Sequence, residues 1–368
     1  LSPGDLGSYK ASRLLTPQFL SRAKSLLKPD GVLYLVTAYD SDRYITAEAA
    51  ELLAILSNAI KETFTYATLW PGNNTLLFAS DTPLGHAEPD TLCARLTRFG
   101  YESRYYSADR LADRLDPFKL ERLAQALGQS NEINSVTRPL LSYYQTIYRS
   151  KASGIDRSVF TWLRQHQWSI LLLPVLILLL FSFTVRSKRG SQSYGLFLYF
   201  VAGAVSLSLE LVSFYVYQSS AGSLYAEMAI LIGAFMLGLA LGTYTAIRWA
   251  SESKGGPALM MLLAATMIFL FTWDTVHSQA QLLYHAAFLL VVAIATGSLF
   301  VAATHIYYGD GHSGNRGTGY AVEIAGSAVG ALFATTLLLP FIGLGWLLLS
   351  LALLIVLSLG GLIVCQRG

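Results

Sequence analysis

The chain has 368 residues, of which 53% are hydrophobic and only 13% are charged, and its mean hydropathy of +0.46 is high for a soluble protein. This composition favours a membrane protein with several spanning helices. The formal net charge of +3 is too small to indicate a nucleic-acid partner. The two cysteines, Cys93 and Cys365, lie far apart, so we expect neither a disulfide framework nor a metal site.

The first 150 residues have the pattern of a mixed α/β domain. Thr16 followed by Pro17 predicts a helix start, and the apolar run at 31–38 predicts a buried strand. Thr46 opens a second predicted helix. Residues 66–80, with "PGNN" between two apolar runs, predict an antiparallel hairpin. Further helices are expected from about 88, 107 and 117.

About three strands are too few for a sheet that buries both faces. We therefore interpret residues 1–150 as the second half of a Rossmann-like, methyltransferase-like domain. A segment before residue 1, or another chain, would complete the sheet. The chain begins with Leu rather than Met, which favours a piece of a longer protein.

A linker at 151–167 leads to a region, 168–368, in which the pattern changes to long apolar runs. Each run is long enough to cross a bilayer, which predicts a polytopic helical domain of about seven helices. The expected spans lie near 168–185, 195–217, 225–247, 257–273, 281–303, 319–341 and 346–365.

Positive charge alternates between the connecting loops of this region. Lys or Arg follows the first, third and fifth spans and ends the chain, whereas the loops after the second, fourth and sixth spans carry neither. The positive-inside rule then places the C-terminus in the cytoplasm and residues 1–167 outside it. Lys151, Arg157 and Arg164, which precede the first span, favour the opposite orientation for that span.

Several segments in order resemble the spermidine synthase (polyamine aminopropyltransferase) family, and more closely the bacterial membrane proteins that fuse such a domain to transmembrane helices. The segments are "LSPGDLGSYKASRLLTPQFLSRAKSLLKPDGVLYL", "YATLWPGNNTLLFAS", "NEINSVTRPLLSYY", "LELVSFYVYQSSAGSLYAEMAILIGAFMLGLALG" and "GYAVEIAGSAVGALF". The resemblance covers nearly the whole chain. It implies a location in the bacterial inner membrane, and it implies aminopropyl transfer in the members that are active.

The chain departs from this family at the positions that carry catalysis. The family's Gly-rich cofactor loop and its acidic partner would lie before residue 1, so no cofactor is expected in this chain. An S-adenosylmethionine-type cofactor is expected only with an upstream segment. If Asp5 matches the second Asp of the family's active-site loop, the general base position is Ser2, whose hydroxyl is a poor base near neutral pH. Leu6 also replaces the family's Pro.

Three aromatic residues, Tyr9, Tyr66 and Trp70, are candidate ligand-binding residues. Their rings could line a polyamine site through cation–π contacts, or they could belong to the core. The sequence leaves both readings open.

Polar residues also occur inside the apolar runs. Helical spacing places Ser206, Glu210, Ser213 and Tyr217 on one face, and it places Glu323 and Ser327 on another. Glu227 lies near the outer end of the next run. Gly238 with Gly242, and Gly326 with Gly330, have the GxxxG spacing of closely packed helices.

An unpaired carboxylate inside a bilayer costs several kcal/mol, so Glu210 and Glu323 should be protonated or hydrogen-bonded. They are either a proton or cation site of a transporter or polar groups that fix helix packing. Three functions follow from the sequence. The first is a scaffold or binding subunit of a membrane complex with a catalytically degenerate domain. The alternatives are a membrane-bound aminopropyltransferase and a proton- or cation-coupled transporter.

Overall fold

A computed structural model describes residues 9–84, 88–100, 107–128, 130–152, 190–221, 225–249, 255–275, 281–309 and 317–367, together with residues 162, 165, 166 and 169. The chain divides into two compact units, Leu1–Phe160 and Thr161–Gly368. The first expected membrane span, 168–185, lies almost wholly outside the described residues.

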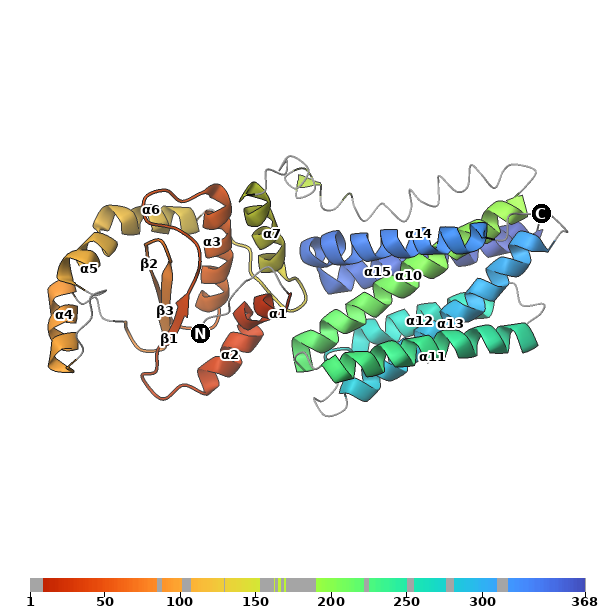
Figure 1. The fold of residues 1–368 in the computed structure, drawn as a ribbon, viewed down its shortest axis with the longest axis horizontal. Helices are drawn as coiled ribbons and strands as arrows, with labels where there is room; N and C mark the ends of the chain where they lie inside the picture. Colours follow the sequence, from red (N-terminus) through yellow and green to blue (C-terminus); the bar gives the residue numbers. More distant parts are fainter. Residues whose placement is uncertain are drawn as a thin grey trace. The chain divides into compact units, whose positions relative to one another are not determined.

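The first unit is a three-stranded sheet with helices (Figure 1). Its elements are α1 Tyr9–Ser12, η1 Arg13–Leu15, α2 Pro17–Ser25, β1 Leu33–Val36, α3 Ala47–Lys61, β2 Tyr66–Trp70, β3 Leu76–Ser80, α4 Pro89–Arg98, α5 Ala108–Arg114, α6 Pro117–Leu127 and α7 Leu140–Ala152.

Local signals in the sequence place these elements correctly. Thr16 caps α2 by accepting a hydrogen bond from the amide of Phe19, with Pro17 as the first helical residue. Thr46 caps α3 in the same way through the amide of Ala49. The expected strand at 31–38 and the hairpin at 66–80 are confirmed by β1 and by the antiparallel pair β2–β3.

The sheet has the strand order β1-β3-β2, and both pairs are antiparallel. Since β1 and β2 both run against β3, they run parallel to each other, and α3 connects them. The strands and α3 thus form a parallel crossover unit with β3 inserted between its two strands. The structure shows a small antiparallel sheet, and a complete Rossmann-like sheet does not appear among the described residues.

Helix α3 forms the core of this unit. Ten of its residues are buried, including Leu52, Leu53, Ile55 and Leu56. A helix that is apolar on all sides must be enclosed, and α3 packs against β2 and against α6 and α7 (Figure 1). Each fully buried Leu or Ile stabilises the fold by about 1.5–3 kcal/mol, so α3 supplies much of the hydrophobic stabilisation.

The second unit is a bundle of long apolar helices (Figure 1). Its elements are α10 Gly190–Ala221, α11 Tyr225–Trp249, α12 Gly256–Thr272, α13 Gln281–Tyr308, α14 Thr318–Leu332, the π-helix η4 Phe333–Leu338 and α15 Leu339–Arg367.

Four helical segments among the described residues are long and apolar enough to cross a membrane, so this is an integral membrane protein. They are Gln192–Ser220, Ala226–Arg248, Gln281–Tyr308 and Thr318–Ile363. The expected span at 257–273 appears as α12, whose 17 residues make it shorter than these segments. The two spans expected at 319–341 and 346–365 fall in the single 46-residue segment.

That 46-residue segment is interrupted at Gly343, where the backbone has φ 85° and ψ 170°. This left-handed conformation favours glycine and breaks the helix. A straight helix of this length would extend roughly 70 Å, more than twice the hydrocarbon thickness of a bilayer.

Glycines let the helices of the bundle approach closely. A Cβ atom at Gly238 or Gly242 of α11 would clash with the backbone of α13 at Leu290 or Ile294. A Cβ atom at Gly326 or Gly330 of α14 would clash in the same way with α10. Both GxxxG pairs therefore lie at direct backbone contacts between helices.

Candidate functional site

The outer edge of β1 is the first candidate site, which we call the β1 edge. The amide of Thr37 donates to the carbonyl of Thr75 on the β3 side, at 3.0 Å. Because backbone groups alternate along a strand, the amides of Tyr34 and Val36 point away from β3. Among the described residues no further strand lies on this side of β1, where the amide of Val36 points. Such an edge is a template for pairing with a further strand.

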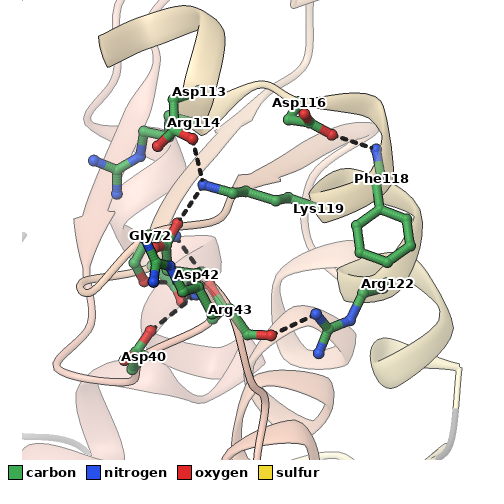
Figure 2. A network of polar contacts seen from close by, with 12 residues as sticks. Asp40, Asp42, Arg43, Gly72, Asp113, Arg114, Asp116, Phe118, Lys119 and Arg122 are labelled. Carbon is green, nitrogen blue, oxygen red and sulfur yellow. Dashed lines mark hydrogen bonds and ion pairs between the residues drawn. The ribbon is translucent and has the colours of Figure 1, made fainter.

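A polar network covers the carboxyl ends of β1 and β2 (Figure 2). Lys119 of α6 contacts Asp42 at 2.7 Å and Asp113 at 2.9 Å, and its side chain is only 14% exposed. Arg122 donates to the carbonyl of Arg43, and Arg114 donates to the carbonyl of Asn74. The hydrogen bond from Asp42, followed by that from Asp113, raises the pKa of Lys119 above its ordinary value.

Beneath this network, the loops after β1 and β2 are joined by buried hydroxyl groups. Ser41 and Thr75 share a hydrogen bond of 2.6 Å, and Thr75 donates to the carbonyl of Tyr39. The amide of Gly72 donates to Ser41. Ligands of α/β sheets bind outside the carboxyl ends of parallel strands. Here that position is filled by polar groups of the chain that pair with one another.

The three aromatic candidates are not gathered into one site by the described residues. Tyr66 and Trp70 lie on the same face of β2; Tyr66 is 41% exposed, and Trp70 packs on Phe78 with ring centroids 4.7 Å apart. Phe78 also contacts Tyr34 at 5.1 Å, which extends the aromatic face to β1. Tyr9 begins α1. Ser2 and Asp5 lie outside the described residues.

The segment "NEINSVTRPLLSYY" has a clear structural role through Asn134, which is fully buried. Its amide donates to the carbonyls of Ser12 and Leu15 at 2.9 and 3.0 Å. Its oxygen accepts from the amide of Leu141 and from the hydroxyl of Ser12, both at 3.2 Å. Asn134 therefore ties the first helices of the unit to α7.

The second candidate site lies on one face of α10. Glu210, Ser213 and Tyr217 are spaced three and four residues apart, so they share a face of the helix. All three are buried; Glu210 is 7% exposed, and Ser213 is fully buried. No hydrogen bond or ion pair of the Glu210 carboxyl occurs within the part of the chain that the structure describes.

Ser213 and Tyr217 belong to a polar group that we call the His285 cluster: Ser213, Tyr217, Glu227 and His285. The Nδ1 atom of His285 lies 2.8 Å from the Ser213 hydroxyl, and the Tyr217 hydroxyl donates to Glu227. The edge of the Tyr217 ring meets His285 at 5.4 Å. Phe269 and Tyr284 also contact the His285 ring, at 5.8 and 5.2 Å.

His285 was not anticipated from the sequence, although a histidine inside the apolar run "QLLYHAAFLL" was a usable signal. Its side chain is 1% exposed and lies on α13, which packs along α10. Ser213, Tyr217 and Glu227 were predicted as candidates, so only His285 was missed. That these four residues meet depends on how the helices pack.

The remaining polar candidates lie elsewhere in the bundle. Ser206 donates to the carbonyl of Gly203 on its own helix. Glu323 and Ser327 of α14 are partly buried and lie against Gly203 of α10. The described residues show no hydrogen bond of the Glu323 carboxyl. Glu323 is therefore separate from the His285 cluster.

A scan against protein-family models, a search of curated proteins and a search of solved structures each find no match to this chain. The resemblance to spermidine synthases thus stays a prediction.

Proposed function

We propose that this chain is a subunit of a membrane complex, in which the α/β unit binds a further β-strand along the β1 edge. The observation that carries the proposal is the strand order β1-β3-β2, which leaves β1 at an edge of the described sheet with the amide of Val36 directed away from β3. The added strand comes from a segment beyond these residues or from a partner chain.

The arrangement around β1 supports this reading. The crossover β1–α3–β2 is the repeating unit of larger parallel sheets, and strands in such sheets have neighbours on both sides. Tyr34 lies in β1 and is 39% exposed, and Val32, just before the strand, is 45% exposed. These apolar side chains would be covered by an added strand and the segment that follows it.

A proline at position 36 tests the proposal, because it removes one outward amide and leaves the pairing with β3 intact. The wild-type complex is extracted from membranes in mild detergent, and its mass is measured. Val36→Pro should release the chain as a smaller particle, whereas Val36→Ala should not. The proposal fails if the wild type is a single chain of this length or if both variants keep the wild-type mass.

The binding unit is further proposed to be a catalytically degenerate relative of the spermidine synthases. The chain places Ser2 at the family's base position, and the carboxyl ends of β1 and β2 are filled by the Lys119 network (Figure 2). A membrane-bound aminopropyltransferase is the alternative. Calorimetry with decarboxylated S-adenosylmethionine separates the two, and we expect no binding heat.

A second candidate function, a proton- or cation-coupled transporter, is favoured by one observation in the bundle. Glu210 is 7% exposed, and its carboxyl has no hydrogen bond or ion pair with the residues that the structure describes. It lies one helical turn from the His285 cluster. Intramembrane carboxyl groups commonly mark ion pathways. The chain in lipid vesicles should then conduct protons under an imposed potential, and Glu210→Gln should reduce the flux to that of empty vesicles.

The proposed topology has seven crossings. It counts the four membrane-spanning segments, with Thr318–Ile363 crossing twice, together with α12 and the span at 168–185. Lys or Arg follows the first, third and fifth expected spans and ends the chain. We propose that the C-terminus is cytoplasmic in a bacterial inner membrane, with residues 1–167 outside. A reporter fused after residue 368 that works only in the cytoplasm tests this orientation.

A further inference from the structure

The position of Glu210 in its helix is the starting point. Glu210 lies 10 residues from Ser220, where the membrane-spanning segment of α10 ends. At 1.5 Å per residue this is about 15 Å, which is half of the roughly 30 Å hydrocarbon thickness. Glu210 is thus near the middle of the membrane, where an unpaired carboxylate costs several kcal/mol.

Groups that exchange protons connect Glu210 with one end of the bundle. Glu227 lies in the first turn of α11 and is only partly buried. It accepts a hydrogen bond from Tyr217, whose ring touches His285, and His285 is hydrogen-bonded to Ser213. Ser213 and Glu210 are three residues apart, so their Cβ atoms are about 5–6 Å apart.

The surroundings favour a proton over other cations at this position. The described residues contain no group of three His, Cys, Asp or Glu side chains that could hold a metal ion. Helices α13, α14, α15 and η4 pack against α10. Their titratable side chains are His285, His305 and tyrosines on α13, Tyr320 and Glu323 on α14, and none on η4 or on α15 before Cys365. No Lys or Arg occurs in 190–247, 255–315 or 317–366.

We infer that Glu210 is a proton-binding site in the middle of the bundle, loaded from the Glu227 end through Tyr217, His285 and Ser213. The Tyr217 and Ser213 hydroxyls each give up their own hydrogen and accept the incoming one, and His285 takes a proton on one ring nitrogen and releases one from the other. Glu227 takes its proton from water at its end of the bundle, so the net change is one proton moved from water to the Glu210 carboxylate. The inference rests on the transporter candidate and names its coupling ion and the end of the bundle from which it enters.

Infrared spectroscopy of the full chain in phosphatidylcholine vesicles tests this directly. A protonated carboxyl has a carbonyl stretch that shifts when its proton exchanges for deuterium. Glu210→Gln should remove this band, Glu210→Asp should shift it, and the matched variant Glu323→Gln should keep it. The inference is wrong if the wild type shows no such band at any pH or if the band survives in Glu210→Gln.

The route is tested by the rate of that exchange after transfer to D2O. Tyr217→Phe should slow the exchange about tenfold, which corresponds to one lost hydrogen bond of roughly 1.4 kcal/mol. Tyr199→Phe is the matched control, because Tyr199 is another buried tyrosine of α10, hydrogen-bonded to Thr304 instead. Equal rates in the two variants would overturn the route.

These measurements separate the site from the transporter function. If the Glu210 band shows the expected exchange but the vesicles show no net proton flux, the proton-binding site is supported and the transporter function is contradicted. If proton flux is unchanged in Glu210→Gln, the transporter function is supported and this site is contradicted.

Discussion

The two units of the chain use different means to hold their segments together. In the α/β unit, side chains reach across long stretches of sequence to backbone groups, as Asn134 does with Ser12 and Leu15. In the bundle, backbone meets backbone at glycines, as Gly326 of α14 does with Phe200 of α10. The difference follows from the surroundings of each unit. Helices in lipid gain little from apolar burial and are held together by close packing.

The largest expected effect tests the packing of the bundle. Gly326→Leu would place a side chain where a Cβ atom already collides with α10, and overpacking of this kind costs about 3 kcal/mol. Gly233→Leu is the matched control, because nothing lies within 4 Å of a Cβ atom there. Unfolding of the full chain in mixed detergent measures both variants. Equal stability would show that the bundle is not held by close glycine contacts.

A smaller effect is expected from Asn134→Ala in the α/β unit. The change leaves the carbonyls of Ser12 and Leu15 without their partner, at a cost of about 2–3 kcal/mol. In the full chain, the rate of amide hydrogen exchange should rise in residues 9–15 and in residues 140–148. Asn131→Ala is the matched control, because Asn131 is exposed and lies three residues before Asn134. This variant should change amide exchange in neither region. If the two variants behave alike, Asn134 does not tie these segments together.

The smallest effect concerns the surface ion pair of Lys24 and Asp81, in which Lys24 Nζ lies 2.8 Å from Asp81 Oδ1. The hydrogen bond from Lys24 lowers the pKa of Asp81 below its ordinary value of 3.8. Its stabilisation is therefore fully present above pH 3.8 and is lost as the pH falls through the lowered pKa. The melting temperature of Asp81→Asn should be slightly below wild type at neutral pH and should converge with it in acid. A gap that widens in acid would contradict the assignment.

The local elements of the α/β unit could be predicted because their signals lie close together in the sequence. Thr16 with Pro17, and the turn "PGNN", act on their own neighbours. The insertion of β3 between β1 and β2 could not be predicted in this way. The pairing of β1 with β3 joins residues 40 or more positions apart, and the Lys119 contact with Asp42 spans 77 positions.

The candidate site in the bundle was predictable only in part. The face of α10 that carries Glu210, Ser213 and Tyr217 follows from helical spacing alone. The contact with His285 depends on how α10 and α13 pack, which hydropathy does not encode. The break at Gly343, by contrast, falls between the spans expected at 319–341 and 346–365, because glycines interrupt the apolar run there.

The measurement that tests the central claim most directly is amide hydrogen exchange along β1, resolved to single residues. The amide of Leu35 faces β3 and serves as the internal reference. In native membranes, the amide of Val36 should be as protected as that of Leu35, and after purification of the isolated chain it should exchange quickly. Fast exchange of the Val36 amide in native membranes would show that no strand binds the β1 edge and would contradict the account.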